Sequence, residues 1–107
     1  MAQSATSPAR EAIRGTVPKL ADSADTIIYG EVWERQQVSK RDRSLITCSA
    51  LMATGRYEQL RGHLAHALAN GVTQEEISEL ITHLAFYAGW PSAMTAATLA
   101  KEVFAAS

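Results

Sequence analysis

The chain has 107 residues, of which 47% are hydrophobic and 20% charged, and its ten Lys and Arg residues nearly balance its eleven Asp and Glu residues. With a formal net charge of −1, the protein lacks the broad positive potential that attracts nucleic acids and anionic membranes. The sequence therefore predicts neither as a partner. The single cysteine, Cys48, excludes an intrachain disulfide framework and a cysteine-rich zinc site, which favours a cytoplasmic location, and no apolar run approaches the roughly 20 residues of a membrane span.

The composition changes near residue 18 and predicts two regions. Residues 1–18 are small and polar, are interrupted by Pro8, Gly15 and Pro18, and show no sustained periodicity, which is typical of a flexible arm. Residues 19–107 are rich in alanine and contain no proline before Pro91, so they are predicted to form one helical domain.

The first helices of this domain are marked by apolar periodicity and by end signals. Apolar residues at helical spacing predict a helix over about 22–35, in which Gly30 is the weak point. A second helix is predicted to begin after Ser39, a good N-cap residue, and to stop at Gly55.

The remaining helices are marked more strongly. The third is expected over about 57–70, because Asn70-Gly71 is a common helix ending. The fourth is expected to begin after Thr73, which forms a capping box with Glu76, and to end at Gly89, before a fifth helix that opens at Pro91. The predicted fold is therefore a compact all-α bundle of about five helices. The sequence also has more large apolar side chains than one small core can bury, which favours an oligomer. These side chains are Trp33, Phe86, Tyr87, Trp90 and Phe104.

Three histidines are the first candidates for chemistry, since imidazole titrates near neutral pH. His63 and His66 are three residues apart, but no carboxylate follows at a ligand spacing, so no metal site is predicted. His63 lies at the edge of the apolar stripe of its helix, where it could act as a general acid or base. The pattern alone favours the alternative, a structural histidine bonded to a backbone carbonyl.

A second candidate is the arginine pair at the start of the second helix. The guanidinium groups of Arg41 and Arg43 could hold a substrate carboxylate in a bidentate manner, although such clusters are often solvated charges. Cys48 has no His or Lys one turn away that would activate its thiol, so a buried, inert side chain is expected.

The segment from Tyr29 to Phe104 resembles the carboxymuconolactone decarboxylase family. The likeness rests on R-x-R-S-L-I from Arg41, on L-x-x-H-x-x-x-A-L-x-N-G-V-T-x-E-E-I around His63, and on H-x-x-x-Y-A-G-x-P from His83. The resemblance implies an all-helical, alkylhydroperoxidase D-like protomer that assembles into trimers or hexamers, with active sites at or near the subunit contacts.

The redox branch of that family carries C-x-x-C-x-x-x-H, preceded by a glutamate. When its histidine is matched with His63, Arg56 and Gln59 stand at the cysteine positions and Ser44 stands at the glutamate position. The chain is therefore similar to the decarboxylase branch, which implies cofactor-free conversion of 4-carboxymuconolactone to 3-oxoadipate enol-lactone, with release of carbon dioxide, in the degradation of aromatic compounds.

The resemblance also suggests roles for individual residues. His63 would deliver a proton and Arg43 would orient a carboxylate or the lactone oxygen, while the substrate-binding residues would be Trp33, Arg41, His83 and Tyr87. Packing between subunits is an equal alternative for Trp33.

One element departs from the family pattern. Gln36-Gln37-Val38 replaces the usual Pro-Gly-Leu. This difference leaves an alternative open, in which the protein is a family member that acts on, or only binds, a different small molecule. Such a member could serve in a natural-product pathway or as a scaffold.

Overall fold

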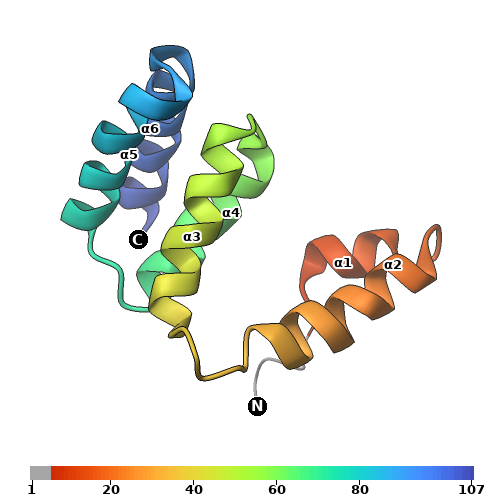
Figure 1. Cartoon of the computed structure of the whole chain (residues 1–107). Coiled ribbons are helices and arrows are strands. Elements are labelled where there is room, and N and C mark those ends of the chain that lie inside the picture. Colours follow the sequence, from red (N-terminus) through yellow and green to blue (C-terminus); the bar gives the residue numbers. More distant parts are fainter. Residues whose placement is uncertain (1–5) are drawn as a thin grey trace. The chain divides into compact units, whose positions relative to one another are not determined.

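The computed structural model describes residues 6–107, and every regular element in that range is helical, which confirms the predicted all-α class there. Residues 6–40 and 41–107 form two separate compact units. In chain order the elements are α1 (Pro8–Ile13), α2 (Pro18–Ser23), η2 (Ala24–Val32), α3 (Lys40–Ala53), α4 (Tyr57–Ala69), α5 (Gln74–Ala88) and α6 (Trp90–Ala106), as Figure 1 shows. Over the described residues, no helix combines the length and apolar character that a bilayer span requires.

Helix α1 lies in the segment for which the sequence predicts a flexible arm. Its first turn is stabilised locally, because the Ser7 side chain accepts a hydrogen bond from the Arg10 amide and Pro8 occupies the start of the helix. Helical structure in this segment was not expected from its periodicity. The flexibility of the arm stays a prediction, and its residues 1–5 lie outside the described residues.

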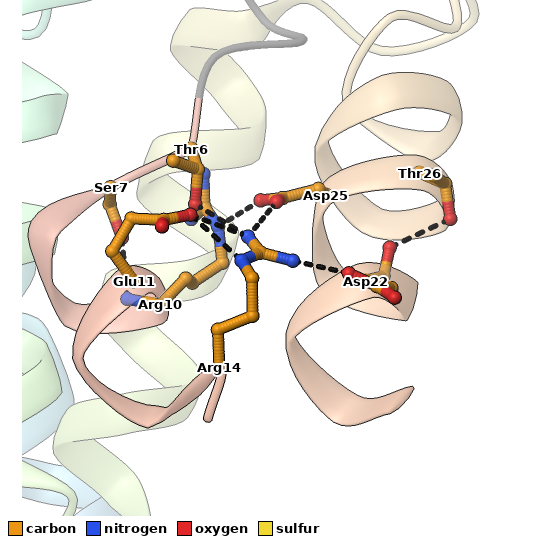
Figure 2. Close-up of polar contacts among 8 residues, drawn as sticks. All are labelled: Thr6, Ser7, Arg10, Glu11, Arg14, Asp22, Asp25 and Thr26. Atoms are coloured by element: carbon orange, nitrogen blue, oxygen red, sulfur yellow. Dashed lines mark hydrogen bonds and ion pairs between the residues drawn. The ribbon is translucent and has the colours of Figure 1, made fainter. Parts of the chain in front are cut away.

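Ion pairs connect α1 to the helices that follow it (Figure 2). Arg14 pairs with Glu11, Asp22 and Asp25, while Arg10 pairs with Asp25 and also lies over the Tyr29 ring, 4.3 Å from its centroid. Burial acts to raise the pKa of Asp25, but hydrogen bonds from Arg14 and Arg10 outweigh it, so the pKa lies below its ordinary value. The Asp25 carboxylate thus forms ion pairs with both Arg10 and Arg14.

Replacing Asp25 with asparagine is expected to loosen α1, because the change removes the charge that both arginines contact. Amide hydrogen exchange over residues 8–14 should become several-fold faster. Asp22→Asn is the matched control, since it removes one ion pair of Arg14 and leaves Asp25 in place. Because the folded-state pKa of Asp25 is lowered, the wild-type segment should also lose this stabilisation as the pH falls below the ordinary value of 3.8. Equal exchange rates in the wild type and Asp25→Asn would argue against the network.

The helix predicted over about 22–35 differs from the observed one in its start and in its type. It begins at Pro18 as α2 and continues as the π-helix η2, in which each amide bonds to the carbonyl five residues earlier; the Trp33 amide continues this pattern with the Ile28 carbonyl at 2.9 Å. At Gly30 a Cβ atom would lie 2.8 Å from the Asp25 carbonyl oxygen. Glycine therefore permits a backbone approach that any side chain would prevent.

The second unit follows the sequence prediction closely, because its helix ends are set by local chemistry. Thr73 and Glu76 form the predicted capping box, with hydrogen bonds of 2.9 and 3.0 Å. The two preceding turns contain Gly55 (φ 72°) and Gly71 (φ 98°), which adopt the left-handed conformations that favour glycine. The fifth predicted helix begins at Trp90, one residue before Pro91.

The core of the second unit is formed by all four of its helices. Helix α6 packs against both α5 and α4 (Figure 1). The largest side chains of this cluster that are exposed by less than 2% are Cys48, Met52, Leu60, Leu64 and Ile77. The Asn70 amide donates a 3.0 Å hydrogen bond to the buried hydroxyl of Ser44, which joins the end of α4 to α3.

The corner where α5 meets α6 remains apolar at its surface. Phe86, Tyr87, Trp90 and Met94, here called the corner patch, are each more than half exposed. The Phe86 and Trp90 rings meet edge to face with their centroids 5.4 Å apart. A cluster of large exposed apolar side chains is typical of an interaction surface.

Candidate functional site

His63 occupies the position on α4 at which the apolar face meets the polar one. It follows the buried Leu60 by three residues and precedes the buried Leu64, and the ring is half-buried with its Nδ1 atom shielded from solvent. Burial lowers the pKa of His63, and the neighbouring His66, whose ring centroid is 5.9 Å away, lowers it further. In the absence of a ligand, the imidazole is therefore predominantly neutral at neutral pH.

This electrostatic coupling can be tested directly. Replacing His66 with glutamine should raise the pKa of His63, because the nearby charge that opposes its protonation is removed. The pKa can be measured by NMR titration of the ring Hε1 proton. His83→Gln, on α5, is the control and should leave the His63 titration unchanged. An unchanged His63 pKa in His66→Gln would leave burial as the cause of the shift.

The two arginines of α3 have different surroundings. The Arg41 guanidinium bonds to Glu76 and, at 3.0 Å, to its neighbour Asp42. Glu76 is itself part of the capping box, and its pKa is lowered by the Thr73 backbone hydrogen bond and by Arg41. Arg41 therefore ties the start of α3 to the start of α5, whereas Arg43 is half-buried on the first turns of α3.

The other predicted substrate-binding residues lie in different settings. His83 and Tyr87 are one turn apart on α5, are both exposed, and stack with their ring centroids 5.0 Å apart and their planes at 26°. Trp33 belongs to the first unit, where it is 6% exposed and stacks on Tyr29 at 6.0 Å. The pairing of His83 with Tyr87 follows from their spacing of four residues, a signal that the sequence already carries.

Cys48 is buried in the core of the second unit. Burial raises its pKa to about 11, so the side chain remains a thiol at neutral pH. Thiol nucleophilicity requires the thiolate, which is therefore scarce here. Among the residues that the structure describes, no group of three or more His, Cys, Asp or Glu side chains is arranged to hold a metal ion.

A groove between α5 and α6, which the sequence did not indicate, has a volume of about 360 Å³. Its walls contain Ser78 and Thr82 from α5 and Lys101 from α6, and none of the residues predicted for the site. The groove is thus separate from the residues to which the family resemblance assigns chemistry.

Comparison with known proteins places these residues in a family context. Residues 18–102 match the model of the carboxymuconolactone decarboxylase family. The chain is 46% identical over 76 residues to 4-carboxymuconolactone decarboxylase of Acinetobacter baylyi, covering 71% of this chain and 57% of the relative. It is 34% identical over 74 residues to nitrosuccinic acid decarboxylase of Metarhizium robertsii, covering 69% and 52%.

A third relative is an uncharacterised 15.0 kDa protein of Paracoccus denitrificans. It is 30% identical over 96 residues, which cover 88% of this chain and 72% of that protein. The chain spans little more than half the length of each of the two named decarboxylases.

Proposed function

The chain belongs to the carboxymuconolactone decarboxylase family, and from this premise we propose that it catalyses cofactor-free decarboxylation of 4-carboxymuconolactone, or of a related carboxylated lactone, to 3-oxoadipate enol-lactone in the cytoplasmic degradation of aromatic compounds. The proposal is supported by the 46% identity to a 4-carboxymuconolactone decarboxylase. The observation that carries it is the half-buried imidazole of His63, whose lowered pKa is typical of an acid–base group held in a partly dry setting.

The reaction requires the protein to stabilise charge and to move one proton. The bond between the ring carbon and the carboxylate breaks, carbon dioxide leaves, and the electron pair enters the unsaturated lactone as a dienolate. A proton must then reach carbon to give the enol-lactone. Preorganised positive charge near the lactone oxygen stabilises the dienolate, and this is where most of the acceleration would arise.

In this proposal His63 delivers the proton and Arg43 orients the substrate. A bound carboxylate close to the imidazole favours its charged form and raises the pKa of His63 from the lowered value of the ligand-free protein. The proton donor would therefore form when substrate binds. Arg41 is fixed by its bonds to Glu76 and Asp42, so in this proposal it adds charge from a set position while Arg43 makes the carboxylate contact.

The remaining site residues are proposed to complete the pocket. His83 and Tyr87 would contribute polar lining, Trp33 an apolar wall, and Arg41 a second positive charge near the substrate. Excluding water would strengthen the hydrogen bonds that favour the dienolate. Because the two side chains on α5 are exposed, their lining role requires a surface that covers them.

A second copy of the chain is the proposed cover, in a trimer or hexamer. The corner patch supports this, since Tyr87 is both one of its residues and a proposed lining residue. Replacing Phe86 and Trp90 together with serine should lower the molar mass in solution, measured by light scattering after size-exclusion chromatography. Ile46→Ser, which changes an exposed apolar residue of α3, is the control and should keep the assembly. An unchanged mass in the double variant would remove the corner patch from the interface.

The proposed activity is tested by adding 4-carboxymuconolactone to the purified protein and following carbon dioxide release and enol-lactone formation by NMR. We expect catalytic turnover without an added cofactor. Nitrosuccinic acid, the substrate named for the second relative, is included as an alternative carboxylated compound. Absence of turnover with the lactone would overturn the proposed reaction.

The alternative is a member of the family that acts on, or only binds, a different small molecule. The sequence Gln36-Gln37-Val38 favours this alternative, because it stands where the family usually has Pro-Gly-Leu. Saturable lactone binding without carbon dioxide release would support a binding role. Turnover of nitrosuccinic acid alone would support a different substrate.

A further inference from the structure

The groove between α5 and α6 is lined by both apolar and polar side chains. Ile81 of α5 is a buried apolar lining residue, and Ala97 and Phe104 are apolar lining residues of α6. A volume of about 360 Å³ lies within the range of roughly 300–1,000 Å³ that is usual for small-molecule sites.

Two hydrogen-bond donors of the groove are available to a ligand. Lys101 forms no ion pair with any residue in the range 6–107, and the Ser78 hydroxyl forms no hydrogen bond within the same range. The Thr82 hydroxyl donates its hydrogen to the Ser78 carbonyl at 2.9 Å, so its oxygen offers only an acceptor. The groove therefore presents one positive charge and one neutral donor beside apolar surface.

We propose that this groove binds a small amphipathic monocarboxylate, with its carboxylate at Lys101 and Ser78 and its ring or short acyl chain over Ile81, Ala97 and Phe104. The ammonium group supplies charge complementarity, and the hydroxyl donates to the second carboxylate oxygen. The apolar lining favours a hydrophobic body over a small inorganic anion. The site shares no residue with the proposed decarboxylation machinery, so it goes beyond the proposed function.

The probe is benzoate, titrated into the full chain and followed by amide chemical shifts in NMR. Saturable shifts are expected at residues 78–82 and 97–104, with a dissociation constant in the millimolar range, as suits an open groove and a small ligand. Benzamide has nearly the same shape but no charge, so it should bind roughly fivefold more weakly. Equal affinity for the two compounds, or shifts elsewhere in the chain only, would overturn the proposal.

Variants of the groove residues distinguish the contribution of the Lys101 charge from that of the groove's shape. Lys101→Met should weaken benzoate binding roughly fivefold, whereas Lys101→Arg should restore it. Lys19→Met removes an exposed lysine of the first unit and is the matched control, with unchanged affinity expected. Ala97→Leu adds bulk at an exposed position and should block the groove while the amide spectrum stays that of a folded protein. Unchanged binding in both Lys101→Met and Ala97→Leu would refute the site.

Benzoate binding in the groove is expected to be independent of the proposed catalytic activity. His63→Ala should bind benzoate as the wild type does, because His63 lies on α4 and does not line the groove. A loss of decarboxylation in that variant with intact benzoate binding would support both proposals. If the wild type binds benzoate but does not turn over the lactone, the groove stands and the proposed reaction fails.

Discussion

Replacing His63 with alanine is expected to lower turnover of 4-carboxymuconolactone by roughly a hundredfold or more, which is the usual size of a general acid–base contribution. The structural basis is the half-buried ring on α4, whose lowered pKa shows that its protonation responds to its surroundings. Steady-state kinetics by NMR or absorbance would measure kcat, and circular dichroism would check that the helices remain.

The pH dependence gives the same experiment a second readout. Because burial and His66 lower the pKa of His63, the imidazolium predominates in the ligand-free protein only at pH values below the ordinary pKa of 6.5. If this form donates the proton, kcat/KM of the wild type should fall as the pH rises through that lowered pKa. The His63→Ala variant should lose this pH dependence along with most of its activity.

The control for this variant is His66→Ala on the same helix. His66 is also half-buried and one turn away, but the proposal gives it no contact with substrate. It should retain activity within a few-fold, with the pH profile displaced toward higher pH. Near-normal turnover in His63→Ala would exclude His63 as the proton donor.

Replacing Leu64 with alanine is expected to cost about 2–5 kcal/mol of unfolding free energy, the range found when a large buried aliphatic side chain leaves a cavity. Leu64 is 1% exposed and belongs to the core cluster formed by all four helices of the second unit. Since the whole free energy of unfolding of a small domain is about 5–15 kcal/mol, this is a large share of it. Urea denaturation followed by circular dichroism would measure the change.

Ile46→Ala on α3 is the matched control, because it also removes an aliphatic side chain but at a position that is 59% exposed. Its cost should stay near 0.5 kcal/mol, as is usual at the surface. Similar losses in the two variants would mean that Ile46 is covered in solution. A small loss in Leu64→Ala would contradict the packing of α4 in the core.

Helix ends that depend on neighbours in the sequence were predictable. Thr73 and Glu76 lie three residues apart, and their reciprocal hydrogen bonds set the start of α5 as expected. Gly55 and Gly71 likewise end α3 and α4 through their own backbone conformations. These signals need no tertiary contact, so the bounds of the last four helices were predicted to within a few residues.

Features that depend on distant partners were not predictable. Arg10 and Arg14 form ion pairs with Asp25, which lies more than ten positions further along the chain. These ion pairs involve residues of α1 and its C-terminal end, and the apolar periodicity of the sequence did not predict that helix. Arg41 bonds to Glu76, which lies 35 positions away. The R-x-R-S-L-I motif that contains Arg41 therefore gave no sign that this arginine joins two helices. Charge alone does not identify a partner.

The same contrast applies to the candidate site. The partial burial of His63 follows from its place beside Leu60 and Leu64, and the sequence predicted it. In contrast, Met94 lies on α6 among buried apolar residues of that helix, yet it is 60% exposed in the corner patch. An apolar pattern does not distinguish a side chain that fills the core from one that faces another molecule.

The π-helix η2 fixes how many residues separate α2 from Trp33. A π-helix uses more residues per turn than the 3.6 of an α-helix, because each amide bonds to the carbonyl five rather than four residues earlier. A relative that is one residue shorter here could therefore complete the same turns as an α-helix and still aim its indole in the same direction. Alignment gaps within residues 24–32 therefore have geometric meaning and should be placed with the backbone hydrogen-bonding pattern in view.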